Sequence, residues 1–154
     1  MSTHSFIFTP SLWLGEGKIT LSMVEEELNF FTRWNVSHKD PYGIIECTQE
    51  IQIKGLSDMM LNQFIFSHVS PGSFVIELEN QAMGKVQGEG VISDKVIAWE
   101  FRMSDIGFEG IEIYEKQEDN TYSMHAEYAT NDQFRTLIQG KVWKQNKAEP
   151  KGKK

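Results

Sequence analysis

The stretch IIECTQEIQIK, residues 44–54, decides the fold class of this chain of 154 residues. Its side chains alternate strictly. One side carries Ile45, Cys47, Gln49, Ile51 and Ile53, and the other carries Glu46, Thr48, Glu50, Gln52 and Lys54. A β-strand with one sheltered and one wet face shows this period of two. A turn with proline at its second position, Asp40-Pro-Tyr-Gly43, precedes the stretch, and Gly55 ends it.

Similar short runs continue on both sides of this stretch. They cover residues 13–22, 28–36, 59–69, 74–82, 96–103, 111–117, 122–129 and 135–145. The breaks between them are rich in Asn, Asp, Gly and Pro, which supply turn conformations. Residues 84–90 are glycine-rich and lack the Gly-Lys-Ser/Thr ending of a phosphate loop, so we interpret them as a turn or bulge. Two short segments, 23–27 and 132–134, are the helical candidates.

The spacing of these runs predicts an all-β fold, an antiparallel up-and-down barrel of about nine to ten strands. Parallel neighbours would need crossovers of a dozen or more residues, for which the chain has no room. Closing a long meander into a barrel removes its exposed edges. A two-sheet sandwich is the alternative, and it would need longer crossover loops. We expect one barrel domain over residues 1–143, followed by a lysine-rich flexible tail over 144–154.

Charge and composition exclude several classes of function. The chain has 15 Lys and Arg against 22 Asp and Glu, and the tail alone carries five lysines and one glutamate. An acidic body repels phosphate backbones, so we expect no nucleic-acid partner. No stretch approaches the roughly 18 consecutive apolar residues of a membrane span, and no secretory signal is visible. The single cysteine, Cys47, excludes an internal disulfide, so we expect a cytoplasmic protein.

The layout resembles the calycin superfamily, which includes lipocalins, intracellular fatty-acid-binding proteins and nitrobindin-like barrels. Trp13-Leu-Gly-Glu-Gly-Lys in the first strand, the long meander, and the closing Gly140-Lys-Val-Trp143 carry the resemblance. It implies a barrel that binds a small hydrophobic ligand. Two features depart from the family pattern. Only residues 22–27 are available for the helical lid of fatty-acid-binding proteins, and residues 135–145 contain no haem-ligating histidine.

The leading functional hypothesis is a small intracellular barrel that binds an apolar or amphipathic ligand of lipid or tetrapyrrole type, without catalysis and without a resident cofactor. The expected ligand-binding residues are Trp34, Phe64, Phe66, Trp99, Arg102, His125, Tyr128 and Arg135. The alternative is a structural or protein-interaction barrel with a filled interior, acting through its outer surface or as a homodimer. The run 59–66 is apolar on both faces, which indicates either packing beneath residues 6–8 or a dimer contact.

No catalytic or metal-binding residues are predicted. The four histidines have no ligand spacing, and only the pairs Glu100/Arg102 and His125/Glu127 could serve as an acid–base pair. The bulk of Trp99 and its alternate neighbours favours their facing inward, which leaves Glu100 and Arg102 as a surface ion pair. Cys47 is expected to be buried. A solvated barrel exterior is the predicted place of the carboxylates Glu77, Glu79, Glu100, Glu109, Glu112 and Glu115.

The closing strand supplies one detailed expectation. Gly140 has no side chain, so we expect Trp13 of the first strand to lie across it where the barrel closes. A short helical piece capped by Asp132 is expected to precede this strand.

Overall fold

The computed structural model describes residues 4, 6–21, 27–81, 84–103, 107–129 and 135–145. All regular secondary structure in these residues is β-strand, as predicted. The strands are β1 (Ser11–Leu21), β2 (Glu27–Val36), β3 (Ile45–Ile53), β4 (Met59–Ser67), β5 (Ser73–Asn80), β6 (Gly84–Ile92), β7 (Val96–Met103), β8 (Phe108–Lys116), β9 (Tyr122–Ala129) and β10 (Arg135–Lys144).

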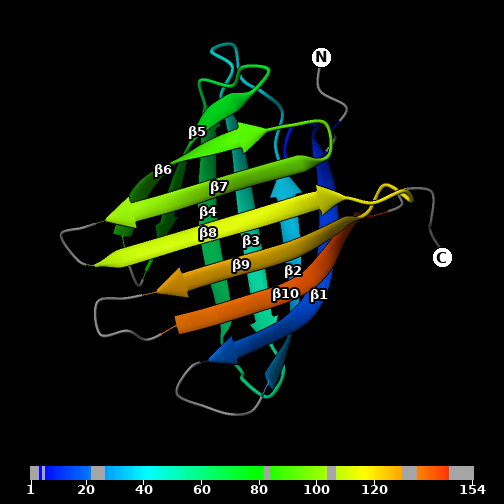
Figure 1. The fold of residues 1–154 in the computed structure, drawn as a ribbon, viewed down its shortest axis with the longest axis vertical. Helices are drawn as coiled ribbons and strands as arrows, with labels where there is room; N and C mark the ends of the chain where they lie inside the picture. The colour runs from blue at the N-terminus through cyan, green and yellow to red at the C-terminus, as the bar shows by residue number, and fades with distance from the viewer. Residues whose placement is uncertain are drawn as a thin grey trace.

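The ten strands form a closed antiparallel barrel in which each strand pairs with its neighbours along the chain. β1 pairs with β10 as well as with β2, and this pairing closes the barrel. In Figure 1, β7 to β10 cross in front of β2 to β4 at a steep angle. The up-and-down barrel of nine to ten strands that the sequence predicts is therefore confirmed, with ten strands.

Strand β6 corrects the interpretation of residues 84–90 as a turn or bulge. Gly88 and Gly90 belong to the ladder between β5 and β7. A Cβ at Gly90 would overlap the ring of Phe74, and one at Gly88 would meet the ring of Phe101 and the β7 backbone. The glycines are thus needed where rings of neighbouring strands lie close to the β6 backbone. The helical candidates at 23–26 and 132–134, with the Asp132 cap, lie outside the described residues, and Glu27 begins β2.

The seam between β1 and β10 is built around two facing glycines. Gly17 is the register partner of Gly140, whereas Trp13 pairs with Lys144. A Cβ at Gly140 would overlap the carbonyl oxygen of Glu16 and lie 2.9 Å from the Cα of Gly17. The expectation that Trp13 lies across Gly140 is therefore wrong, because the register places Trp13 four residues further along the seam. What Gly140 accommodates is the backbone of β1.

Replacing Gly140 with valine is expected to overpack this seam and to lower the free energy of unfolding by roughly 1–3 kcal/mol. The three atoms nearest to the new Cβ all belong to the backbone of Glu16 and Gly17, so relief requires a backbone shift. Denaturant melts measure the effect, with Gln139→Val as the control, since Gln139 is an exposed residue on the same strand. A Gly140→Val protein that melts like the parent would show that the seam lies elsewhere.

The N-terminal segment closes one end of the barrel, which we call the plugged end. Phe6 is fully buried, and its ring centroid lies 4.9–5.4 Å from those of four aromatic residues. These residues are Trp13, Trp34, Tyr114 and Tyr122. His4 is anchored beside them, with Nδ1 2.7 Å from the Tyr122 hydroxyl and Nε2 2.6 Å from the carbonyl oxygen of Ser93.

The opposite end of the barrel, which we call the open end, holds the first residues of β4. Met59, Met60 and Leu61 are 49–59% exposed there. Because β4 runs from this end toward the plugged end, the N-terminal segment does not cover them. The sequence-based expectation of packing beneath residues 6–8 is therefore wrong for these three residues.

Candidate functional site

Several inward-facing side chains become more exposed toward the open end. On β3, Ile45, Cys47 and Gln49 are at most 4% exposed, whereas Ile51 and Ile53 are only half-buried. Met60 of β4, the register partner of Ile51, is 49% exposed. Leu28, Tyr128 and Ile138 are also half-buried near the open end. Phe30, Phe101 and Phe108 face inward in the same half and are at most 7% exposed. Solvent therefore reaches some of the inward-facing side chains in the half of the barrel nearer the open end, which we call the open half.

Three aromatic rings form the floor of the open half. The ring centroids of Trp34 and Trp99 lie 6.3 Å apart, those of Trp99 and Tyr114 5.1 Å apart, and those of Trp34 and Tyr114 6.2 Å apart. These residues come from β2, β7 and β8, so their rings meet across the barrel. Phe64 stacks on Trp34, and Phe66 stacks on Phe64. The contacts fill the interior on the plugged side with aromatic side chains.

One wall of the open half carries a buried carboxyl group, Glu112, which is 5% exposed. It lies on β8 one inward position nearer the open end than Tyr114. The Tyr114 hydroxyl donates a hydrogen bond of 2.7 Å to Oε1, and the Tyr128 hydroxyl donates to Oε2. Burial raises the pKa of Glu112 from 4.5 to about 7, and the side chains of Tyr114 and Trp99 oppose this rise. Burial also raises the pKa of Tyr114 well above its ordinary value of 10.

The position of Tyr128 depends on a glycine of the neighbouring strand. A Cβ at Gly110 of β8 would overlap the Tyr128 ring, so only glycine lets this ring lie over the β8 backbone. Phe108 stacks on the same ring, with centroids 5.8 Å apart. Tyr128 is thus held between β8 and Phe108, with its hydroxyl directed to Glu112.

A second polar group spans the inward faces of β2 to β5, and we call it the amide wall. Gln49 Nε2 donates to Thr32 Oγ1 over 3.1 Å, and Asn62 Nδ2 donates to Gln49 Oε1 over 3.0 Å. Asn80 Nδ2 then donates to Asn62 Oδ1 over 3.0 Å, while the Thr32 hydroxyl donates to the carbonyl oxygen of Glu50. Each donor has a defined acceptor, so the chain of bonds fixes the orientation of the amides.

The amide wall and Glu112 both border the floor. Thr32 lies one inward position nearer the open end than Trp34, as Glu112 does relative to Tyr114. Since the rings of Trp34 and Tyr114 meet across the barrel, the two polar groups lie on opposite sides of the interior just above the floor. The open half thus has an aromatic floor, two polar groups above it and an apolar rim, and we call this arrangement the cup. The floor rings, Glu112, Thr32 and Gln49 are at most 5% exposed. The rim consists of Leu28, Ile51, Ile53, Met60 and Ile138.

The structure places five of the eight predicted ligand-binding residues on the inner face. Trp34 and Trp99 form part of the floor, Phe64 and Phe66 lie in the filled half, and Tyr128 belongs to the Glu112 wall. Whether they contact a ligand stays a prediction.

The other three predicted residues lie on the outer face. Arg102 pairs with Glu100 over 3.6 Å, which is the surface pair that the bulk of Trp99 predicts. His125 Nε2 and Arg135 Nη1 each lie 3.3 Å from a carboxylate oxygen of Glu127. These side chains point away from the interior. They could therefore bind a ligand only on the outer surface, and this role stays a prediction.

Sequence reasoning missed Glu112, which was expected on a solvated exterior. The two isoleucines beside it, Ile111 and Ile113, favoured the opposite assignment, yet they lie on the outer face of β8 and Ile111 is 38% exposed. A usable signal was present in the other alternate positions. Phe108, Gly110 and Tyr114 share the face of Glu112, and large aromatic residues mark a core-facing side.

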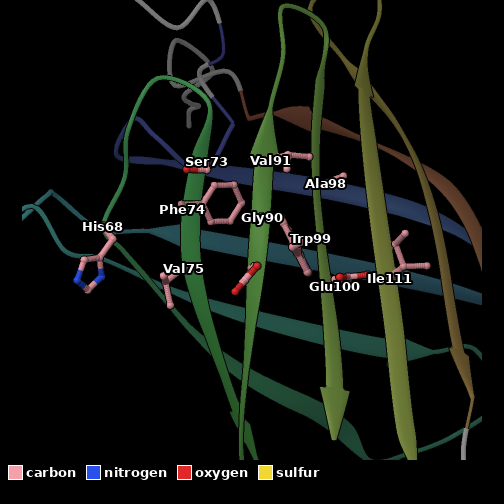
Figure 2. Close-up of a pocket in the computed structure, with 11 residues that line it drawn as sticks. His68, Ser73, Phe74, Val75, Gly90, Val91, Ala98, Trp99, Glu100 and Ile111 are labelled. Atoms are coloured by element: carbon pink, nitrogen blue, oxygen red, sulfur yellow. The ribbon is translucent and has the colours of Figure 1, made fainter.

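A hollow of about 560 Å³ lies on the outer face of β5 to β8. Figure 2 shows the residues that line it. Val75, Val91, Ala98 and Ile111 give it an apolar surface, and Gly90 lies on β6 beside Val91. A second outer hollow adjoins Phe31, which is 60% exposed. Neither hollow identifies a partner, so the homodimer suggested by the sequence stays a prediction.

Other chemistry is limited in the described part of the chain. The thiol of Cys47 lies in the core, where burial raises its pKa to about 12. The described residues contain no group of three or more His, Cys, Asp and Glu side chains that could hold a metal ion. They also include no helix with the length and apolarity to cross a membrane.

No protein-family model matches this chain, and no curated protein matches its sequence.

Proposed function

We propose that this barrel binds a small amphipathic molecule in its open half and releases it unchanged. The observation that supports the proposal is the incomplete burial of the apolar rim of the open half, where Ile51 and Ile53 are half-buried and Met60 is 49% exposed. Small-molecule sites in proteins are concave and mostly apolar, with a few placed polar groups. Barrels of this size commonly bind one small ligand near their mouth. The closed ten-strand barrel is also consistent with a calycin-like protein.

The two kinds of surface in the cup suit the two ends of such a molecule. The apolar rim would cover a hydrocarbon part, at about 0.8 kcal/mol for each buried CH₂ group. The half-buried Asn62 and Asn80 of the amide wall would meet a polar part.

Met60→Trp and Met59→Trp form a matched pair of variants that test this site. Met60 faces the cup and Met59 faces outward, yet both are about half exposed. With N-pentyl dansylamide as a neutral fluorescent probe, we expect binding to the parent, with a blue-shifted and stronger emission. Met60→Trp is expected to weaken binding about tenfold, or ~1.4 kcal/mol, because the indole fills the mouth. Met59→Trp should bind like the parent.

Two outcomes would contradict the proposal. One is that the parent binds neither this probe nor analogues with charged ends. The other is that Met59→Trp and Met60→Trp bind equally well, which would place the probe on the outer face.

A further inference from the structure

We propose that two copies of this chain bind each other head to tail, through two outer hollows of opposite charge. One is the hollow of Figure 2, on β5 to β8, which we call the acidic hollow. The other is the hollow beside Phe31, on β10, β1, β2 and β3, which we call the basic hollow. Both lie on the outer face of the barrel, so this inference goes beyond the proposed function and does not depend on it.

The acidic hollow holds two carboxylates directly opposite each other. Glu89 of β6 and Glu100 of β7 are register partners, and both are exposed. Like charges at directly opposed positions of an antiparallel pair destabilise it. Glu100 lies 3.6 Å from Arg102, whereas Glu89 has no ion-pair partner among the described residues. The described residues that line this hollow include no lysine or arginine, so cations from another molecule would relieve the repulsion.

The basic hollow, of about 770 Å³, has the opposite balance of charge. The described residues that line it include three lysines, Lys18, Lys54 and Lys141, and one acidic residue, Glu16. Lys54 has no ion-pair partner among the described residues. Lys18 lies 3.3 Å from Glu27 in an exposed ion pair. Exposed pairs contribute little to stability, so Lys18 can exchange this partner for another carboxylate.

Each hollow also exposes apolar side chains that a partner would cover. Val91 is 59% exposed and Ile111 38% exposed in the acidic hollow, and Phe31 is 60% exposed beside the basic one. Removing this apolar surface from water favours association, and opposite charges fix which faces meet. Two acidic hollows, or two basic ones, would place like charges against each other. The charges therefore favour contact between unlike faces of two copies.

The two hollows lie on opposite sides of the barrel. β6 of the acidic hollow and β1 of the basic hollow are five strands apart in either direction around the closed sheet. One copy therefore cannot bring its own two hollows together. Contact between two copies leaves one hollow free on each of them, so further copies can add. Head-to-tail contacts of this kind produce a ring or an open chain.

Two charge-reversal variants test this pairing by sedimentation velocity over a range of protein concentrations. Glu89→Lys/Glu100→Lys reverses the acidic hollow, and Lys18→Glu/Lys54→Glu reverses the basic one. At about 20 mM salt, where screening is weak, we expect the average mass of the parent to rise above that of the monomer with concentration. At about 500 mM salt the parent should return toward the monomer.

Each variant alone should associate at least about tenfold more weakly than the parent. An equimolar mixture of the two variants should regain association, because the intact basic hollow of the first can bind the intact acidic hollow of the second. The mixture has the same average net charge as the parent, so a general change in repulsion would not produce this result.

Glu46→Lys/Glu118→Lys is the matched control for the reversed acidic hollow. It makes the same change of net charge at two exposed residues that line neither hollow. This control should associate at least as strongly as the parent. All the substituted residues are exposed, so we expect the variants to fold, and circular dichroism checks this.

Three results would overturn the proposal. The parent could remain a monomer at about 20 mM salt at every concentration. The mixture of the two reversal variants could fail to associate. Association could also be unchanged in both reversal variants, which would place the contact between copies on another face.

Discussion

Replacing Glu112 with glutamine is expected to make the ligand-free protein more stable relative to the parent as the pH rises from acidic to alkaline values. The folded-state pKa of Glu112, about 7, lies above its ordinary value of 4.5, so the folded protein holds this proton more tightly than the unfolded chain. The resulting stability is fully present below pH 4.5 and is lost as the pH rises through 7. The difference between the two pKa values corresponds to roughly 3 kcal/mol. Glutamine does not ionise, so the variant avoids this loss.

Urea melts of both proteins between pH 4.5 and 8.5 measure the effect. The free energy of unfolding of Glu112→Gln, relative to the parent, should rise by roughly 3 kcal/mol over this range. Glu115→Gln, with its exposed carboxylate, should follow the parent. Parallel pH profiles for Glu112→Gln and the parent would mean that Glu112 titrates alike in the folded and unfolded states. The carboxyl group would then not be buried as described.

Replacing Phe6 with alanine is expected to cost roughly 3–5 kcal/mol of unfolding free energy. The Phe6 ring is fully buried, and four other aromatic rings surround it at centroid distances of 4.9–5.4 Å. Removing the ring leaves a cavity that its neighbours can fill only in part, because they belong to four different strands. The N-terminal segment would also lose one of the side chains that fix it at the plugged end.

Denaturant melts test this expectation, with Phe31→Ala as the matched control. Phe31 is 60% exposed on the outer face of β2, so its replacement should change stability by no more than about 0.5 kcal/mol. If Phe6→Ala lost less than about 1 kcal/mol, the N-terminal segment would not close the barrel.

Most of the fold could be predicted from the sequence, because it depends on local patterns. Alternation within each run, as in residues 44–54, and short connections between runs are sufficient to predict an antiparallel meander and its closure. β6 could not be predicted in the same way. Its glycines carry no hydrophobic signal, and their place in the sheet depends on the rings of Phe74 and Phe101 from neighbouring strands.

The candidate site was harder to predict because it depends on register across strands. The bulk of Trp34 and Trp99 marks them as inward-facing, which the floor confirms. Glu112 was assigned to the wrong face. Its charge favoured an exposed position, and this outweighed the aromatic residues at alternate positions, which mark the face of β8 that points into the core. The amide wall joins side chains of four strands, and only their pairing brings them within hydrogen-bond distance.

A crystal structure of the protein with N-pentyl dansylamide tests the binding site most directly. We expect the probe at the rim of the open half, with its dansyl rings against Ile51 and Met60. A probe on the outer face, such as in the hollow beside Gly90, would contradict the account.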